Sequence, residues 1–133
     1  MIYEQDYFHK FTFSESQKES YLASAEHSLK IAKDSNVPEV VFKFSYEALI
    51  KLGVYLIAKD GHRARSIPGH HFKIIEKMSQ ILKNREVFKI GNKIRERRNA
   101  DLYDGCFFIS EKDSKEILEF IEKVFNMPPY FNG

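Results

Sequence analysis

Cysteine is almost absent from this chain, which has one cysteine, Cys106, and no tryptophan among its 133 residues. A single cysteine excludes an internal disulfide, and no cluster of cysteine and histidine has the spacing of a zinc site. Long apolar runs are also missing and the amino terminus is charged, so neither a membrane span nor a secretory signal is visible. We therefore expect a cytoplasmic protein that uses no metal ion or organic cofactor and does not bind membranes.

A large excess of charge of one sign is missing as well. The chain has 21 Lys and Arg against 19 Asp and Glu, a formal net charge of +2. This balance gives no overall attraction to nucleic acid, so any such attraction must be local. Common catalytic signatures are absent too, namely a Gly-rich phosphate loop, HExxH and a nucleophile elbow. The 12 Phe and 7 Tyr indicate a bulky core or a hydrophobic interface with another subunit.

Glycine and proline are scarce, at six and four residues, and apolar residues between them recur at helical spacing. We expect a single all-α domain over residues 1–133, an up-and-down bundle of about five helices. Residues 1–13 are predicted to be an aromatic N-terminal arm that folds back on the bundle or onto a neighbour. The second helix is apolar nearly all round and should be central. The predicted helices run from Ser14 or Ser16 to about Ser35, from Pro38 to about Lys59, from His70 to about Leu82, from about Arg85 to Asp104, and from a capping box at Ser110 to the stop at Met127.

Two segments are predicted to be connections without regular structure. Residues 61–69 contain glycine and proline and read as a polar loop that crosses between helices. Residues 106–109 read as a connector whose aromatic side chains plug the end of the bundle, because an isolated strand there has no partner.

The fourth predicted helix places an arginine on its apolar side. Counting back from Arg98, Ile94, Gly91 and Val87 recur at helical spacing, so Arg98 should point inward. An inward guanidinium needs a carboxylate, a backbone carbonyl, a partner subunit or a bound anion, since an unpaired buried charge costs several kcal/mol. Asp101, three residues on, is the nearest candidate partner. The spacing alone leaves two interpretations open: a structural ion pair or a site.

Basic and polar residues gather in two places. The end of the fourth helix carries Lys89, Lys93, Arg95, Arg97, Arg98, Asn99 and Tyr103, and the loop before the third helix carries His62, Arg63, Arg65, His70 and His71. The first group is able to attract a phosphate backbone locally, and the alternative is a solvated helix face, favoured for Lys89, Lys93 and Arg95. Of the loop histidines, His70 or His71 should cap or pack on the start of the third helix.

Three features of the chain resemble the HEPN superfamily of small helical domains, from about Ser16 to Phe125. The first is a long helix, then a very apolar helix with Phe44–Lys51, then a loop ending in Pro68–His71. The second is the number of helices. The third is Arg98–Asp104, which looks like the family's arginine, four to six variable residues and histidine. The branch with an R-x-x-A-D-Y-like pattern looks most similar.

The resemblance implies several properties. Many HEPN domains are metal-independent ribonucleases, and others are RNA-binding or toxin-antitoxin partners, often encoded beside a small nucleotidyltransferase. In catalytic members a dimer brings two motifs together, so the resemblance implies a homodimer with Arg98 near the twofold axis. Carried over by position, Arg98 matches the phosphate-binding arginine, and Tyr103 occupies the place of the histidine. Arg95, Arg97, Asn99 and Asp101 are the neighbouring candidates for ligand binding.

The chemistry of tyrosine limits what Tyr103 can do in that place. A tyrosine with a pKa near 10 can donate a proton to a leaving oxygen but is a poor base at neutral pH. On a continuous helix, positions 98 and 103 are roughly 140° apart, at about 100° per residue. They converge only if the helix ends between them, which Gly105 favours, or if a second subunit supplies one of them.

Three functions fit these observations. The leading hypothesis is a dimeric HEPN-like domain that binds RNA or a nucleotide, or acts as partner of a nucleotidyltransferase in a toxin-antitoxin-type system. The alternative is a metal-independent endoribonuclease in which Arg98 stabilises the phosphate and Tyr103 or a loop histidine transfers protons. The third is a protein-protein interaction module that uses the aromatic amino terminus and the 106–109 connector.

Overall fold

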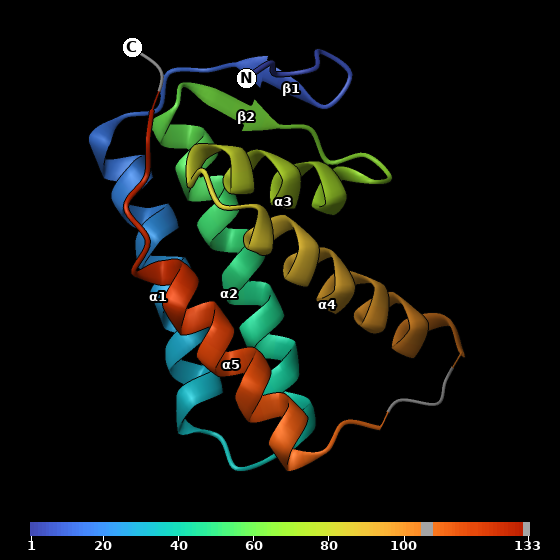
Figure 1. The fold of residues 1–133 in the computed structure, drawn as a ribbon. Coiled ribbons are helices and arrows are strands. Elements are labelled where there is room, and N and C mark those ends of the chain that lie inside the picture. The colour runs from blue at the N-terminus through green and yellow to red at the C-terminus, as the bar shows by residue number, and fades with distance from the viewer. Residues whose placement is uncertain (105–107, 132–133) are drawn as a thin grey trace.

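The computed structural model describes residues 1–104 and 108–131, and it describes residues 101–104 by their backbone alone. Helices dominate this part of the chain (Figure 1), which confirms the predicted all-α class. Each lies within one or two residues of its predicted range. In order they are α1 (Glu15–Asp34), α2 (Pro38–Lys59), α3 (His70–Ile81), α4 (Arg85–Asp104) and α5 (Glu111–Phe125). Within the described residues, no helix has the length and apolar character to cross a bilayer.

Helices α1 and α5 begin where a serine side chain satisfies one of their first backbone N–H groups. The Ser14 hydroxyl accepts from the Gln17 N–H at 3.1 Å, and the Gln17 side chain accepts from the Ser14 N–H at 2.8 Å. The Ser110 hydroxyl accepts from the Asp113 N–H at 3.0 Å. Pro38 opens α2, where its missing N–H is not needed. The two serine caps mark the starts of α1 and α5, and Pro38 marks the start of α2.

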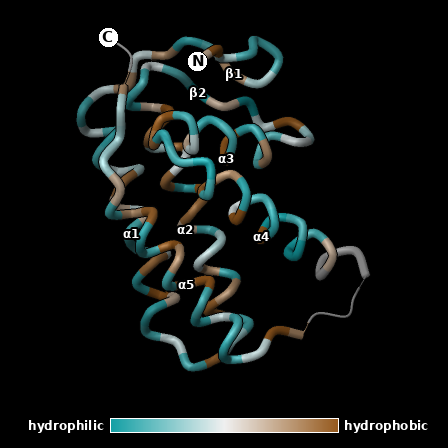
Figure 2. Tube along the Cα trace, viewed as in Figure 1, coloured by the Kyte–Doolittle hydropathy of each residue, from teal (hydrophilic) through white to brown (hydrophobic). Residues whose placement is uncertain are grey.

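Helix α2 is the centre of the bundle, as its composition predicts. It packs against α1, α3 and α5 and also contacts α4 and β2 (His62–Ala64). Figure 2 shows hydrophobic residues concentrated along α2 and α5 and a mainly hydrophilic α4. At Gly53, α2 and α3 are so close that an added Cβ would lie 3.0 Å from the Met78 sulfur. The buried core includes Phe42, Leu49, Ile57, Ile75, Met78, Val87, Ile121 and Val124.

A small sheet closes one end of the bundle. Strand β1 (Phe8–Lys10) pairs antiparallel with β2, with Phe8 opposite Ala64 and Lys10 opposite His62. Phe8 is 1% exposed, so the amino-terminal arm does fold back on the bundle. Strand β2 corrects the prediction of irregular structure for residues 61–69, and β1 is a strand that the sequence pattern did not predict within the arm. Strands of three residues are too short to show a recognisable alternation of apolar and polar residues, and they form only by pairing with a distant partner.

An ion cluster anchors the arm to α3. The Glu4 carboxylate accepts from Lys73 Nζ at 2.8 Å and pairs with Lys77 Nζ at 2.6 Å. Lys77 also donates to the backbone carbonyl of Ile2, and Gln80 Oε1 lies 3.3 Å from its Nζ. The Lys77 side chain is only 2% exposed. Its ammonium group therefore depends on the arm for its charge partner.

The connector before α5 differs from its prediction. Ile109 is 1% exposed, whereas Phe108 is 79% exposed, so Phe108 does not plug the bundle. Neighbouring side chains outside a helix point in different directions, and here the aliphatic one enters the core. Cys106 and Phe107 lie outside the described residues.

A buried hydroxyl in α2 gives a first prediction about stability. Ser45 is fully buried, and its Oγ has no hydrogen-bond partner among the described residues. A buried polar group without a partner costs about 1–3 kcal/mol, and alanine is also the better helix former. We expect Ser45→Ala to raise the free energy of unfolding by about 1 kcal/mol, measured by urea denaturation. Ser28, whose hydroxyl accepts from Lys51 Nζ at 2.9 Å, is the matched control. Ser28→Ala should not stabilise, and equal stabilisation by both would contradict this account.

Candidate functional site

Three helices bring Tyr46, His71 and Arg98 together. Tyr46, on α2, is 4% exposed, and its hydroxyl oxygen lies 2.9 Å from His71 Nδ1, at the start of α3, in a hydrogen bond. The Arg98 guanidinium, from α4, lies over the Tyr46 ring with Cζ 5.6 Å from the centroid. Arg98 is half-buried and follows the buried residues Gly91 and Ile94, so its spacing correctly predicts the inward side. Its contact there is the face of an aromatic ring.

Burial keeps the His71–Tyr46 pair uncharged at neutral pH, and nearby positive charge adds to this effect at His71 only. Burial lowers the pKa of His71 to about 4, and the charges of His70, Arg98 and Arg95 lower it further in the same direction. Burial raises the pKa of Tyr46 to about 12, against the opposing effect of Arg98 and Arg95. Both groups are therefore neutral, and the positive charge of the site belongs to the two arginines.

Arg95 lies beside this group in a similar arrangement. Its Cζ is 5.5 Å from the Phe72 centroid, and its Nε donates to the Asn92 side-chain oxygen at 2.9 Å. Among the described side chains, no carboxylate forms an ion pair with Arg95 or Arg98. A guanidinium that stacks on a ring keeps N–H groups at its edge for an anion. The two arginines thus form a half-buried cationic pair, which we call the Arg95/Arg98 pair.

The structure separates Arg97 from this pair. Its guanidinium lies 3.5 Å from Asp113 and donates to the carbonyl of Phe108 at 3.2 Å, so it ties α4 to the start of α5. Asn99 is half-buried beside Arg98. The side chains of Asp101 and Tyr103 lie outside the described residues, and the predicted Arg98–Asp101 pair lies there with them.

Helix α4 extends through Asp104 without a break, which confirms its predicted range. The helix therefore does not end between positions 98 and 103, which is one of the two conditions for their convergence. The helical pattern continues past Tyr103, so positions 98 and 103 stay roughly 140° apart on one helix. An early end of the helix therefore does not bring positions 98 and 103 to the same side of one chain.

Sequence reasoning missed Tyr46 and the role of His71. The one available signal was a tyrosine hydroxyl on a helix that is otherwise apolar, since a buried hydroxyl needs a partner. His70 fits the structural interpretation, because its Nδ1 donates to the carbonyl of Ile67 at 2.8 Å. No group of three or more histidine, cysteine or acidic residues within the described part of the chain is placed to hold a metal ion.

Comparison of the chain with protein-family models, with curated proteins and with solved structures finds no match.

Proposed function

We propose that this chain is a HEPN-like homodimeric domain that binds the phosphate backbone of RNA at the Arg95/Arg98 pair. Partnership with a nucleotidyltransferase in a toxin-antitoxin-type system is part of the same proposal and rests on the sequence resemblance alone. The observation that carries RNA binding is the pair itself: two half-buried guanidinium groups stacked on rings, without a described carboxylate partner. Half-buried positive charge of this kind is screened less than surface charge and favours an anion.

The site supports binding better than proton transfer. A general base works best when its pKa is near the operating pH, and the pKa of His71 at about 4 makes it a weak base at neutral pH. The ribonuclease alternative keeps one favourable observation, namely that His71 adjoins Tyr46 and Arg98 in the way a proton-transfer group would. In that case a bound phosphate would have to raise the pKa of His71 before it could act.

Arg98→Ala is expected to weaken RNA binding at least tenfold and to flatten the salt dependence of the affinity by about one unit of slope per lost phosphate contact. Binding of a fluorescent single-stranded RNA measures both quantities in a salt series. Arg97→Ala is the matched control, because it removes the same charge from the adjacent position, where Asp113 already engages it. Its affinity should stay within about threefold of wild type.

The same experiment separates the three functions, with chelator present and the thermal stability and solution mass of each variant recorded. Cleavage of the RNA that survives chelator and disappears in Arg98→Ala would replace the binding role with the ribonuclease. Equal loss of affinity in both variants would mean that general charge, not the Arg95/Arg98 pair, binds RNA. No RNA binding by the folded wild type, or a monomeric mass at micromolar concentration, would contradict the proposal and leave the interaction module.

A further inference from the structure

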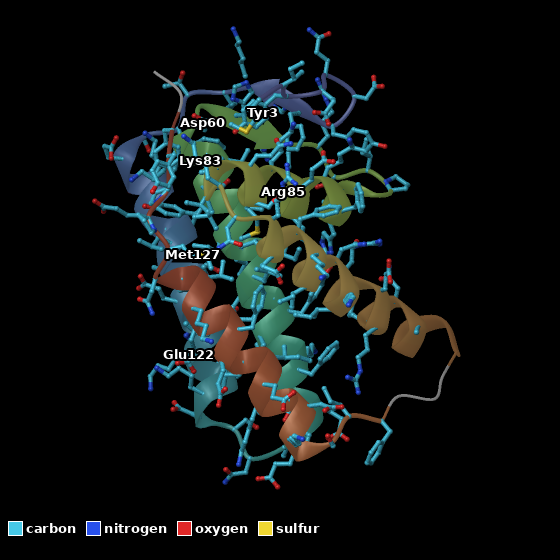
Figure 3. All side chains as sticks on the ribbon, viewed as in Figure 1. Tyr3, Asp60, Lys83, Arg85, Glu122 and Met127 are labelled. Atoms are coloured by element: carbon cyan, nitrogen blue, oxygen red, sulfur yellow. The ribbon has the colours of Figure 1, made fainter. Side chains whose placement is uncertain are left out.

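A second basic site lies at the end of the molecule where the amino-terminal arm meets β2. A pocket of about 270 Å³ opens there, away from the Arg95/Arg98 pair, with seven lining residues: Tyr3, Gln5, Phe8, His9, Lys10, His62 and Arg65. The Tyr3 ring stacks on His62 with centroids 3.7 Å apart and planes 10° from parallel. Tyr3 and Asp60 lie next to each other at this end in Figure 3.

All the charged residues that line the pocket are basic. Lys10 and Arg65 are exposed cations, and none of the seven residues is acidic. The nearby Asp60 carboxylate accepts the Tyr3 hydroxyl at 2.6 Å and does not line the pocket. Arg65 Nε donates to the carbonyl of Gln5 at 3.0 Å, which holds the guanidinium at the rim. Its remaining N–H groups have no acceptor within the described residues, so they are available to a ligand.

The two histidines add polar groups that lack partners. His9 Nδ1 is buried, and no described group forms a hydrogen bond with it. His62 Nδ1 lies 2.9 Å from the carbonyl of Asp60, which can only accept, so this nitrogen carries the proton and Nε2 is left for a ligand. An unpaired buried ring nitrogen is costly in an empty site.

We propose that this pocket binds the phosphoryl group of a small organic phosphate, with Arg65 and Lys10 supplying charge and His9 and His62 supplying hydrogen bonds. Guanidinium and ammonium groups that converge on one pocket favour a phosphate. The volume lies just below the range of about 300–1,000 Å³ that drug-sized ligands occupy, which fits a small molecule and not a polymer chain. This inference does not rest on the proposed RNA binding, because the two sites share no residue.

The test is a titration of the ¹⁵N-labelled protein with inorganic phosphate and, separately, with glycerol 3-phosphate at low salt, followed by the imidazole NMR signals. His9 and His62 should shift and saturate, while His27, exposed on α1, should not move. Tighter binding of glycerol 3-phosphate would identify the organic ester as the ligand class. Equal affinity would identify the phosphoryl group alone as the recognised element, and both results support the site.

Two arginine variants complete the test. Arg65→Gln should weaken the apparent affinity at least fivefold, whereas Arg63→Gln should leave it within about twofold. Arg63 is the matched control because it is exposed on β2, two residues before Arg65, its Cζ lies 5.7 Å from the Phe11 ring centroid, and it does not line the pocket. Parallel shifts of all five histidines, no saturation, or equal losses in the two variants would overturn the proposal. Arg98→Ala should bind phosphate in this pocket as the wild type does, so failure here is distinguishable from failure of RNA binding.

Discussion

Replacing Glu4 with glutamine is expected to lower the free energy of unfolding by about 3 kcal/mol. The variant leaves the buried Lys77 ammonium without its carboxylate, and removing one partner of a buried ion pair typically costs about 3–5 kcal/mol. The carbonyl of Ile2 and the side chain of Gln80 still contact Lys77, which places the expected loss at the lower end. Urea denaturation at pH 7 measures it.

The control for this prediction is Glu76→Gln. Glu76 pairs with Lys73 at 3.4 Å at a half-buried position on α3, and Lys73 keeps the Glu4 carboxylate at 2.8 Å when Glu76 is replaced, so we expect this pair to contribute about 1 kcal/mol or less. In a Lys77→Met background, the loss caused by Glu4→Gln should shrink to a similar size, because no buried charge is then left unpaired. Equal effects of Glu4→Gln and Glu76→Gln in the wild-type background would contradict the anchoring role of Lys77.

The pH dependence of stability checks the same cluster. Burial raises the pKa of Glu4, but the hydrogen bonds from Lys73 and Lys77 outweigh it and lower the pKa to about 2. A carboxyl whose pKa is lower in the folded state stabilises the protein above its unfolded value of about 4.5, and this stabilisation is lost as pH falls towards 2. Between about pH 5 and 2 the wild type should therefore lose more stability than Glu4→Gln does.

The second large effect is expected from Gly53→Ala, which should lower the free energy of unfolding by about 2 kcal/mol. A Cβ at this position would overlap the Ile74 Cγ2 methyl group and lie 3.0 Å from the Met78 sulfur. Overpacking of a core costs about 1–3 kcal/mol, and the branched Ile74 side chain cannot rotate away easily. The better helix propensity of alanine returns about 1 kcal/mol. Thermal or urea unfolding gives the net value.

Gly91→Ala is the matched comparison within the same core. An added Cβ there would lie 3.0 Å from Ile75 Cγ2 and 3.4 Å from Leu49 Cδ2. These neighbouring side chains would need to move only slightly to make room for it. The overpacking cost and the gain in helix propensity should nearly cancel, so the net change should stay within about 1 kcal/mol. If Gly53→Ala were as mild as Gly91→Ala, α2 and α3 would not be held at the close approach described.

The helices were predictable because their signals are local. Ser14, Pro38 and Ser110 mark helix starts within a few residues, and the apolar composition of α2 placed it at the centre. The sheet was not predictable, because Phe8 and Ala64 are paired by tertiary contact and neither strand has a pattern of its own. The burial of Lys77 was not predictable either, because its charge partner Glu4 comes from the arm, far away in the sequence.

The same difference between local signals and tertiary contacts decides which features of the candidate site were predictable. The inward direction of Arg98 followed from its spacing to Ile94 and Gly91 on one helix. Its contact with Tyr46 did not, because that ring comes from α2 and stacking on a ring leaves no sequence pattern. Arg97 looked equivalent to Arg98 in the sequence and differs because Asp113 lies across from it. The roles of Asp101 and Tyr103 stay predictions.

The pairing of β1 with β2 also sets an order of events during synthesis. The ribosome releases residues 1–10 long before β2 and α3, which supply the strand partner of Phe8 and the ammonium partner of Glu4. Until then β1 has no strand to pair with and Glu4 has no ammonium partner, since both partners are distant in sequence. Residues 1–10 thus leave the ribosome before the residues that they pair with, and the closing of this end of the bundle waits for β2 and α3.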